Sequence, residues 1–374
     1  MSDPRTERLA TVLVQYSAAL RPGDRVLIEA ETAAEPLVRA LFERALQAGA
    51  HPHLALSLAG LDTYSGVDDV FLRLASDDQL DYVPPFFETA YREFESRIRV
   101  YSSSNTRLLM RADTARMARR QRALQSLLRM QMERGARGEF RWVTTIFPTI
   151  GHAHDADMSL SEFEDYVFDG CHVAGEDDPV AYWKAVEHKQ ARWAEAFSGH
   201  DRVEIRGPDC DLRLSIRDRR FISSCGTHNM PDGEIFTGPV EDSVEGWVRF
   251  AFPLIYKGRE VEGVELTFED GKVQTWKASK NQDFLESMLA SDDGARYLGE
   301  FGIGTNAALQ QLTRNILLDE KIGGTIHLAL GAGYPDTGSR NRSAIHWDML
   351  VEMRRDSEIR VDGERIYQNG AFRI

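Results

Sequence analysis

A strand–helix–strand pattern near the N-terminus limits the folds open to this chain. Residues 25–30 form a short apolar run typical of a buried strand, and residues 51–58 form a second one. Between them, residues 34–48 carry leucine and alanine at helical spacing and are followed by Gly49, a residue type that commonly ends a helix. Because a helix joins the two strands through short links, we expect the strands to run parallel. The pattern predicts an α/β N-terminal domain with a parallel sheet.

The pattern changes from Arg202 onward to short alternating segments separated by turns. Glu269-Asp270-Gly271 lies between two such segments and is typical of a hairpin. We therefore predict a β-rich α+β C-terminal domain, mostly antiparallel, that carries the functional site, with the N-terminal domain over residues 1–200 and the C-terminal domain over 201–374. The strands are expected at 202–206, 211–216, 221–223, 247–252, 261–268 and 272–277, and the helices at 282–288 and 307–317.

Composition excludes several classes of partner. The 374 residues have a formal net charge of −14, which argues against nucleic acid as the main partner and against a membrane surface. No run of 18 apolar residues occurs, and the N-terminal segment is too polar for a signal peptide. The three cysteines show no CxxC spacing, as is usual in a reducing compartment. We expect a cytoplasmic protein.

Residues 299–349 concentrate acids and histidines in apolar, glycine-rich sequence. Glu300, His327, His346 and Asp348 all lie within this stretch. Burying such groups costs free energy unless a cation meets them. On a strand, residues two apart face the same side, so His346 and Asp348 can reach one ion together. The stretch predicts a metal-dependent hydrolase.

A further candidate ligand is Glu234. It directly follows the turn sequence Pro231-Asp232-Gly233 and begins a short predicted strand. A carboxylate held by a rigid turn is well placed to bind a metal, although a lone acid in this position is more often an exposed turn residue.

Two polar segments have other interpretations. The cluster His152, His154, Asp155 and Asp157 contains zinc-ligand residue types, but we expect a solvated loop there because apolar support is absent. The arginine-rich helix predicted at 113–134 lacks interleaved aromatic residues, so a solvated face is favoured over an RNA-binding one.

The glycine pairs Gly302-x-Gly304 and Gly331-x-Gly333 do not lie in a βαβ unit of the dinucleotide-binding kind. We expect them to let the backbone pass close to a site.

Four motifs, in order along the chain, give a family resemblance. They are Asn-Met-Pro-x-Gly-Glu (229–234), Leu-Gly-Glu-x-Gly-Ile-Gly-Thr-Asn (298–306), Asp-Glu-Lys-Ile-Gly-Gly-Thr-Ile-His (319–327) and Ser-Ala-Ile-His-Trp-Asp (343–348). With them the chain resembles the M29 metalloaminopeptidases over nearly its whole length. The segment between His327 and His346 departs from the family in being short, which bears on the rim of the pocket.

The resemblance implies a function and a site. The expected activity is the release of N-terminal amino acids from peptides with a free N-terminus, by water activated between two divalent ions (zinc, cobalt or manganese) in a homodimer. The implied catalytic residues are Glu300, a candidate proton carrier alongside Glu234, and Tyr334, which would donate a hydrogen bond to the oxyanion. Glu320 is a lesser candidate, expected to contact the ligands rather than a metal. The implied metal ligands are Glu234, Glu300, His327, His346 and Asp348.

Two alternatives remain. Ring-opening dioxygenases of the dihydroxypyridine type are similar to this family and hold one iron with two histidines and a carboxylate, which His327, His346 and Asp348 could supply. The presence of both Glu234 and Glu300 favours the hydrolase. A non-catalytic binding protein is disfavoured, because buried acids without a metal would be costly.

Overall fold

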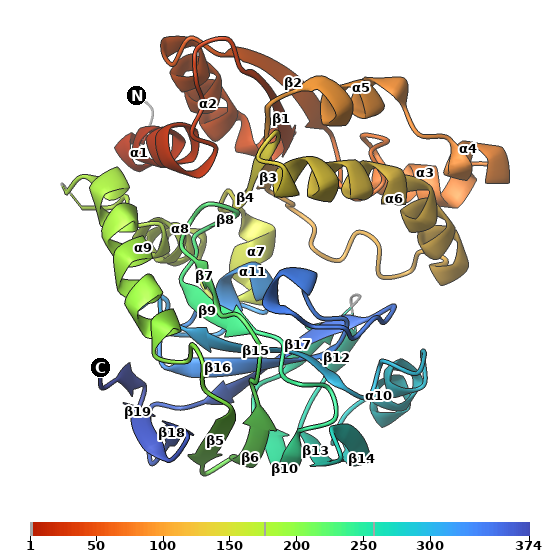
Figure 1. The fold of residues 1–374 in the computed structure, drawn as a ribbon. Helices are drawn as coiled ribbons and strands as arrows, with labels where there is room; N and C mark the ends of the chain where they lie inside the picture. The colour runs from red at the N-terminus through yellow and green to blue at the C-terminus, as the bar shows by residue number, and fades with distance from the viewer. Residues whose placement is uncertain (1–2, 176, 257–258) are drawn as a thin grey trace. The chain divides into compact units, whose positions relative to one another are not determined.

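The computed structural model describes residues 3–175, 177–256 and 259–374. The chain divides into two compact units, coloured from red to blue along the chain in Figure 1. The first unit comprises Met1–Trp183 and Gly226–Pro231, and the second comprises Lys184–Cys225 and Asp232–Ile374. Where the sequence suggested one boundary near residue 200, the chain passes from one unit to the other three times.

The first unit is built on a five-stranded sheet of order β2-β1-β3-β4-β8, in which every neighbouring pair is parallel. The predicted α/β class with a parallel sheet is confirmed. The strands are β1 (Arg25–Glu31), β2 (His51–Ser57), β3 (Ser96–Tyr101), β4 (Arg141–Ile146) and β8 (Asn229–Met230).

Helices connect and cover these strands (Figure 1). On one face, Leu27 of β1 packs with Tyr91 of α5 (Pro85–Glu93) and with Leu124 and Leu127 of α6 (Thr114–Ala136) in one buried cluster. The helices of the unit are α1 (Pro4–Val12), α2 (Glu35–Gln47), α3 (Asp68–Leu74), α4 (Asp77–Asp81), α5 (Pro85–Glu93), α6 (Thr114–Ala136), α7 (Ile150–Asp155) and α8 (Leu160–Gly170), and α9 (Pro179–Glu195) runs from the first unit into the second. In the described ranges, no helix combines the length and the apolar character that crossing a membrane requires.

The arginine-rich helix α6 differs from the solvated face expected for it. Arg120 is 2% exposed, and its guanidinium donates to the carbonyls of Thr63, Leu80 and Tyr82 at 2.6–3.0 Å. Arg116 Nε donates to the carbonyl of Leu72 at 2.6 Å. The expectation was wrong for these arginines because their long side chains bury against backbone carbonyls of the preceding segments, which sequence periodicity does not reveal.

The cluster expected to be a solvated loop is also ordered differently. Residues 150–155 form the short helix α7, whose first turn is capped by the Thr149 hydroxyl. His152 is 8% exposed, its Nδ1 lies 3.0 Å from Thr149 Oγ1, and burial lowers its pKa to about 4. His152 is therefore a buried neutral histidine within the helical cap.

The described residues of the second unit form three antiparallel sheets, which confirms the predicted β-rich class. A five-stranded sheet of order β17-β16-β15-β9-β7 comprises β7 (Ile222–Ser224), β9 (Glu234–Thr237), β15 (Leu298–Gly304), β16 (Thr325–Gly331) and β17 (His346–Glu352). An eight-stranded sheet of order β14-β13-β10-β6-β5-β18-β19-β20 comprises β5 (Arg202–Gly207), β6 (Cys210–Ser215), β10 (Glu245–Phe250), β13 (Val264–Glu269), β14 (Lys272–Lys277), β18 (Glu358–Val361), β19 (Glu364–Gln368) and β20 (Ala371–Phe372). β11 (Leu254–Tyr256) pairs with β12 (Arg259–Val261).

Besides α9 and the short helical turn Pro335–Thr337, the described part of this unit contains two α-helices. α10 (Gln282–Leu289) agrees with the sequence, whereas α11 (Ile316–Asp319) is much shorter than the expected helix at 307–317. Asn315 caps α11 by accepting from Leu317 N, so the helix begins later than its apolar spacing suggested.

Alternation along the strands separates a core face from a second face. Phe301 of β15, Leu328 of β16 and Met349 of β17 are 0% exposed and share one hydrophobic core with Leu212 of β6 and Val248 of β10. Because successive residues of a strand point to opposite sides, the neighbours of these core residues lie on the other face of the five-stranded sheet. That face carries the candidate site.

Candidate metal centre

Four strands of the five-stranded sheet present acids and histidines on the same face. Glu300 precedes the core residue Phe301, and His327 and Asp348 flank Leu328 and Met349 in the same way. Small residues stand opposite the larger ones. Gly304 pairs with Glu234, Gly302 pairs with His327, and Ala329 pairs with both Glu300 and Asp348. The small partners leave room above the sheet for the acidic and imidazole side chains.

Gly302 shows how tight this arrangement is. A Cβ atom at residue 302 would lie 2.0 Å from His327 Nε2, closer than any real contact of this kind. The glycines of this stretch thus serve the close packing expected for them, rather than a nucleotide.

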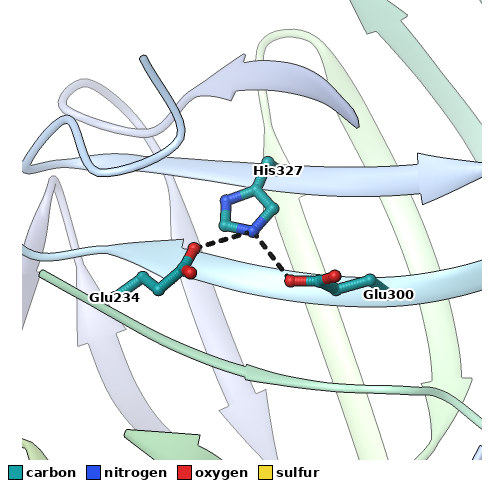
Figure 2. Close-up of side chains that lie close together, drawn as sticks. All are labelled: Glu234, Glu300 and His327. Carbon is teal, nitrogen blue, oxygen red and sulfur yellow. Dashed lines mark hydrogen bonds and ion pairs between the residues drawn. The ribbon is translucent and has the colours of Figure 1, made fainter. Parts of the chain in front are cut away.

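The first group of possible ligands is Glu234, Glu300 and His327. One donor atom from each lies within 4.8 Å of the others. His327 Nε2 is 3.1 Å from Glu234 Oε2 and 3.2 Å from Glu300 Oε1, as Figure 2 shows. All three side chains are buried. Figure 2 shows both carboxylates turned toward the same ring nitrogen, so one cation could replace the proton between them.

The second group is Glu300, His346 and Asp348, again with donor atoms within 4.8 Å of one another. His346 Nε2 lies 3.4 Å from Glu300 Oε2 and 3.4 Å from Asp348 Oδ2. Glu300 therefore belongs to both groups, with Oε1 facing the first and Oε2 facing the second.

The imidazoles are oriented for binding through Nε2. His346 Nδ1 lies 2.7 Å from the Ala332 carbonyl, and a proton on Nδ1 would be donated there, leaving the Nε2 lone pair toward the carboxylates. Within the described part of the chain, the buried atom Asp348 Oδ1 accepts no hydrogen bond. Carboxylate oxygens and imidazole nitrogens are ligands that zinc, cobalt and manganese accept. The residues fit a metal.

The charges of the centre reinforce this fit. Burial opposes protonation of His327, but Glu234 and Glu300 outweigh it and raise the pKa of His327 well above its ordinary value. Burial likewise opposes the charge on His346, yet Asp348 and Glu300 raise its pKa to about 10. Burial raises the pKa of Glu300. The carboxylates thus favour a positive charge at these positions, which a divalent cation would supply.

Lys321 is a residue of the centre that the sequence analysis missed. It is 0% exposed, and its Nζ lies 2.5 Å from Glu234 Oε1, 2.7 Å from Glu320 Oε1 and 3.5 Å from Asp232 Oδ1. Burial disfavours its charge, but these carboxylates raise its pKa well above the ordinary value. Glu320, whose pKa burial raises to about 8, contacts Lys321 and is in neither ligand group among the described residues. The clue in the sequence is a lysine directly after Asp-Glu and before an apolar, glycine-rich segment.

Tyr334 lies beside the second group. Its ring centroid is 5.3 Å from that of His346 and 5.4 Å from that of Phe236, and the residue is 42% exposed. The tyrosine therefore stands at an open edge of the acidic centre.

Two overlapping groups of acids and histidines on an antiparallel sheet are typical of the metal site of a metalloenzyme. Comparison with known families makes this specific. The family model described as thermophilic metalloprotease (M29) matches residues 2–372, and the chain belongs to this family, whose members are hydrolases. The resemblance deduced from the motifs is confirmed.

Characterised relatives align over almost the whole chain. The chain is 27% identical to aminopeptidase AmpS of Bacillus subtilis (strain 168), with 96% of each protein covered. It is 26% identical to aminopeptidase T of Thermus thermophilus, with 97% of this chain and 95% of the relative covered.

Solved structures share the fold. Wild-type AmpT from Thermus thermophilus superimposes with a TM-score of 0.84 at 23% identity, covering 99% of both chains. 2,5-Dihydroxypyridine dioxygenase from Pseudomonas putida KT2440 gives a TM-score of 0.60 at 12% identity, covering 98% of this chain and 96% of the other.

Proposed function

We propose that this protein is an aminopeptidase that uses two divalent ions to release the N-terminal residue of peptides. The observation that carries the proposal is the position of Glu300, whose two oxygens face two different groups of ligands. A carboxylate placed in this way suits a bridge between two metal ions. The aminopeptidase names of the full-length relatives support the substrate class.

Each side chain then has a defined part. Glu234 and His327 would hold one ion, His346 and Asp348 would hold the other, and Glu300 would serve both. Zinc, cobalt or manganese at these positions would supply an activated water and polarise the scissile carbonyl. One of the two glutamates, Glu300 or Glu234, would also carry a proton toward the leaving amine.

The remaining groups act on the substrate. Tyr334, at the open edge, is placed to donate its hydroxyl hydrogen to the oxygen on which negative charge develops. The acidic surroundings favour the α-ammonium group of a peptide over an anionic substrate.

The alternative is a single-iron dioxygenase that uses His327, His346 and Asp348, and the shared fold with a dihydroxypyridine dioxygenase is the observation in its favour. However, among the described residues these three side chains do not form one group. His327 clusters with Glu234 and Glu300, and His346 and Asp348 cluster with Glu300. This grouping supports the two-ion hydrolase.

We also propose a homodimer in the cytoplasm. β2 is an edge strand of its sheet, and Leu54, Leu56 and Leu58 beside that edge are 42%, 50% and 74% exposed. Exposed leucines along an unpaired strand edge favour association with another chain. The three cysteines Cys171, Cys210 and Cys225 are free and buried, which suits a reducing compartment.

Metal analysis together with a panel of aminoacyl p-nitroanilides tests the function. The proposal expects two divalent ions per chain and cobalt-stimulated release of an N-terminal residue. One iron per chain with oxygen-dependent ring cleavage and no peptidase activity would contradict it.

The variant Glu300→Ala tests the shared ligand. It should abolish at least one metal position and the activity, whereas Glu265→Ala, on the exposed side of β13, should change neither. Unchanged metal content and activity in Glu300→Ala would show that the assignment is wrong.

A further inference from the structure

The first ligand group has a built-in cation beside it. The Lys321 ammonium is completely buried and faces Asp232, Glu234 and Glu320. Its backbone is fixed as well, because Asn306 N donates to the Lys321 carbonyl at 3.0 Å and Asn306 Nδ2 donates to the Asp232 carbonyl at 2.8 Å. The same asparagine therefore ties the lysine to the turn that precedes Glu234.

The Lys321 ammonium interacts differently with the two ligand groups. Lys321 pairs directly with Glu234 of the first group through Oε1, which leaves Oε2 toward His327. Asp348 of the second group pairs with His346 instead. A metal ion in the first group would thus share Glu234 with the Lys321 ammonium. A metal ion in the second group would not share Asp348 with it in this way.

We propose that Lys321 is an internal counter-ion that stabilises the acidic centre before any metal binds and makes the Glu234–Glu300–His327 position the weaker of two metal positions. The inference rests on the two-ion function proposed above. Lys321 contacts a ligand rather than the substrate, so it is a positioning residue.

Two electrostatic effects determine whether Lys321 weakens or strengthens metal binding in the first group. Two positive charges near each other repel, and the repulsion is stronger in a buried site than in water. Removing one partner of a buried ion pair leaves the other charge uncompensated. Without Lys321, the carboxylates Asp232, Glu234 and Glu320 would face one another with no fixed cation. Both effects increase the gain from binding a metal ion in the first group, and the second also destabilises the metal-free chain.

The test is a titration of the metal-free, full-length chain with Co²⁺, followed by calorimetry and by the visible absorption of cobalt. Wild type should show two unequal binding events. In Lys321→Met the weaker event should tighten by about tenfold or more, while the tighter event changes much less. The metal-free variant should also unfold at a lower temperature than wild type, and Co²⁺ should reduce that difference. Lys277→Met, which removes an exposed lysine of β14, is the matched control and should show neither effect.

A second variant keeps the inference testable if Lys321→Met does not fold. Asp232→Asn removes one anion beside the ammonium while leaving a carbonyl oxygen for the Ser224 hydroxyl, which lies 3.0 Å from Asp232 Oδ2. The weaker Co²⁺ event should then weaken by several-fold, which is the opposite sign. Unchanged or weakened binding in Lys321→Met, or unchanged or tighter binding in Asp232→Asn, would overturn the inference while leaving the aminopeptidase proposal intact. A wild-type chain that binds only one ion would overturn the two-ion function and this inference with it.

Discussion

Gly302 lies directly beside the imidazole of His327, so that a Cβ atom at residue 302 would stand 2.0 Å from Nε2. The two residues are register partners on neighbouring strands, β15 and β16. Since the strands cannot separate without breaking their ladder, the ring would have to move. The position of a proposed metal ligand therefore depends on a residue that contributes no side chain.

Replacing this glycine should disable the site. In Gly302→Ala the methyl group should displace the His327 ring, and a displacement of about 1 Å at a reacting centre can cost about 100-fold in rate. We expect loss of metal from the first ligand group and a fall in kcat/KM of at least about that size. Metal content and hydrolysis of an aminoacyl p-nitroanilide measure both. Gly175→Ala, where an added Cβ meets nothing within 4 Å, is the matched control.

Stability of the metal-free chain should depend on pH through His346. Its folded pKa of about 10 lies above the ordinary 6.5 because Asp348 and Glu300 outweigh the effect of burial. A raised pKa stabilises the fold fully below the ordinary value, and this contribution is lost as the pH rises through the folded value. The thermal midpoint should therefore fall as the pH rises from 6.5 to about 10.

Two comparisons check the origin of that slope. His346→Gln should flatten it, whereas replacement of the exposed His188 by Gln should not. Saturating metal should also flatten it, since the ring nitrogen is then no longer available to a proton. A slope that is identical in His346→Gln would assign the pH dependence to other groups.

Arg120 should be a structural residue of the first unit. Its guanidinium serves three carbonyl groups, so Arg120→Met leaves those buried acceptors without a donor. We expect a loss of about 2–4 kcal/mol in the free energy of unfolding, measured by urea denaturation. Arg122→Met, on the exposed side of α6, should cost far less. Equal losses in the two variants would remove any special role for Arg120.

The proposed dimer gives a prediction about β2. Leu56→Glu places a charge on the exposed strand edge and should shift the chain toward monomer in sedimentation experiments. Leu128→Glu is a matched control, because Leu128 is 53% exposed and Leu56 is 50% exposed. A wild-type chain that sediments as a monomer would contradict the proposal at once.

Local pattern predicted the parts of the site that lie within one strand. His346 and Asp348 share a face because they are two residues apart, and the sequence shows this directly. Glu234 is different, since it meets Glu300 and His327 only through the pairing of β9 with β15 and of β15 with β16. The motifs of the family resemblance, rather than periodicity, brought Glu234 into the expected ligand set.

The surprises share one physical cause. Lys321 and Arg120 belong to residue types that are usually exposed, and each is buried here by partners that are distant in sequence. Hydropathy describes the residue alone, whereas burial of a polar group is decided by whether its hydrogen bonds and charges are met. Such partners become visible only once the chain is folded.

The strand β8 is the fifth strand of the N-terminal parallel sheet, yet it comes from residues 229–230, after the second unit has already begun. During synthesis, the β4 edge of the first four strands stays unpaired until this later segment has left the ribosome. A single cut in the chain likewise cannot release either unit whole, because each is encoded in two pieces. Neither unit can therefore be exchanged as one continuous segment of the gene. The strand β8 lies directly before the turn that leads to Glu234, so this turn is inherited together with the sheet that β8 completes.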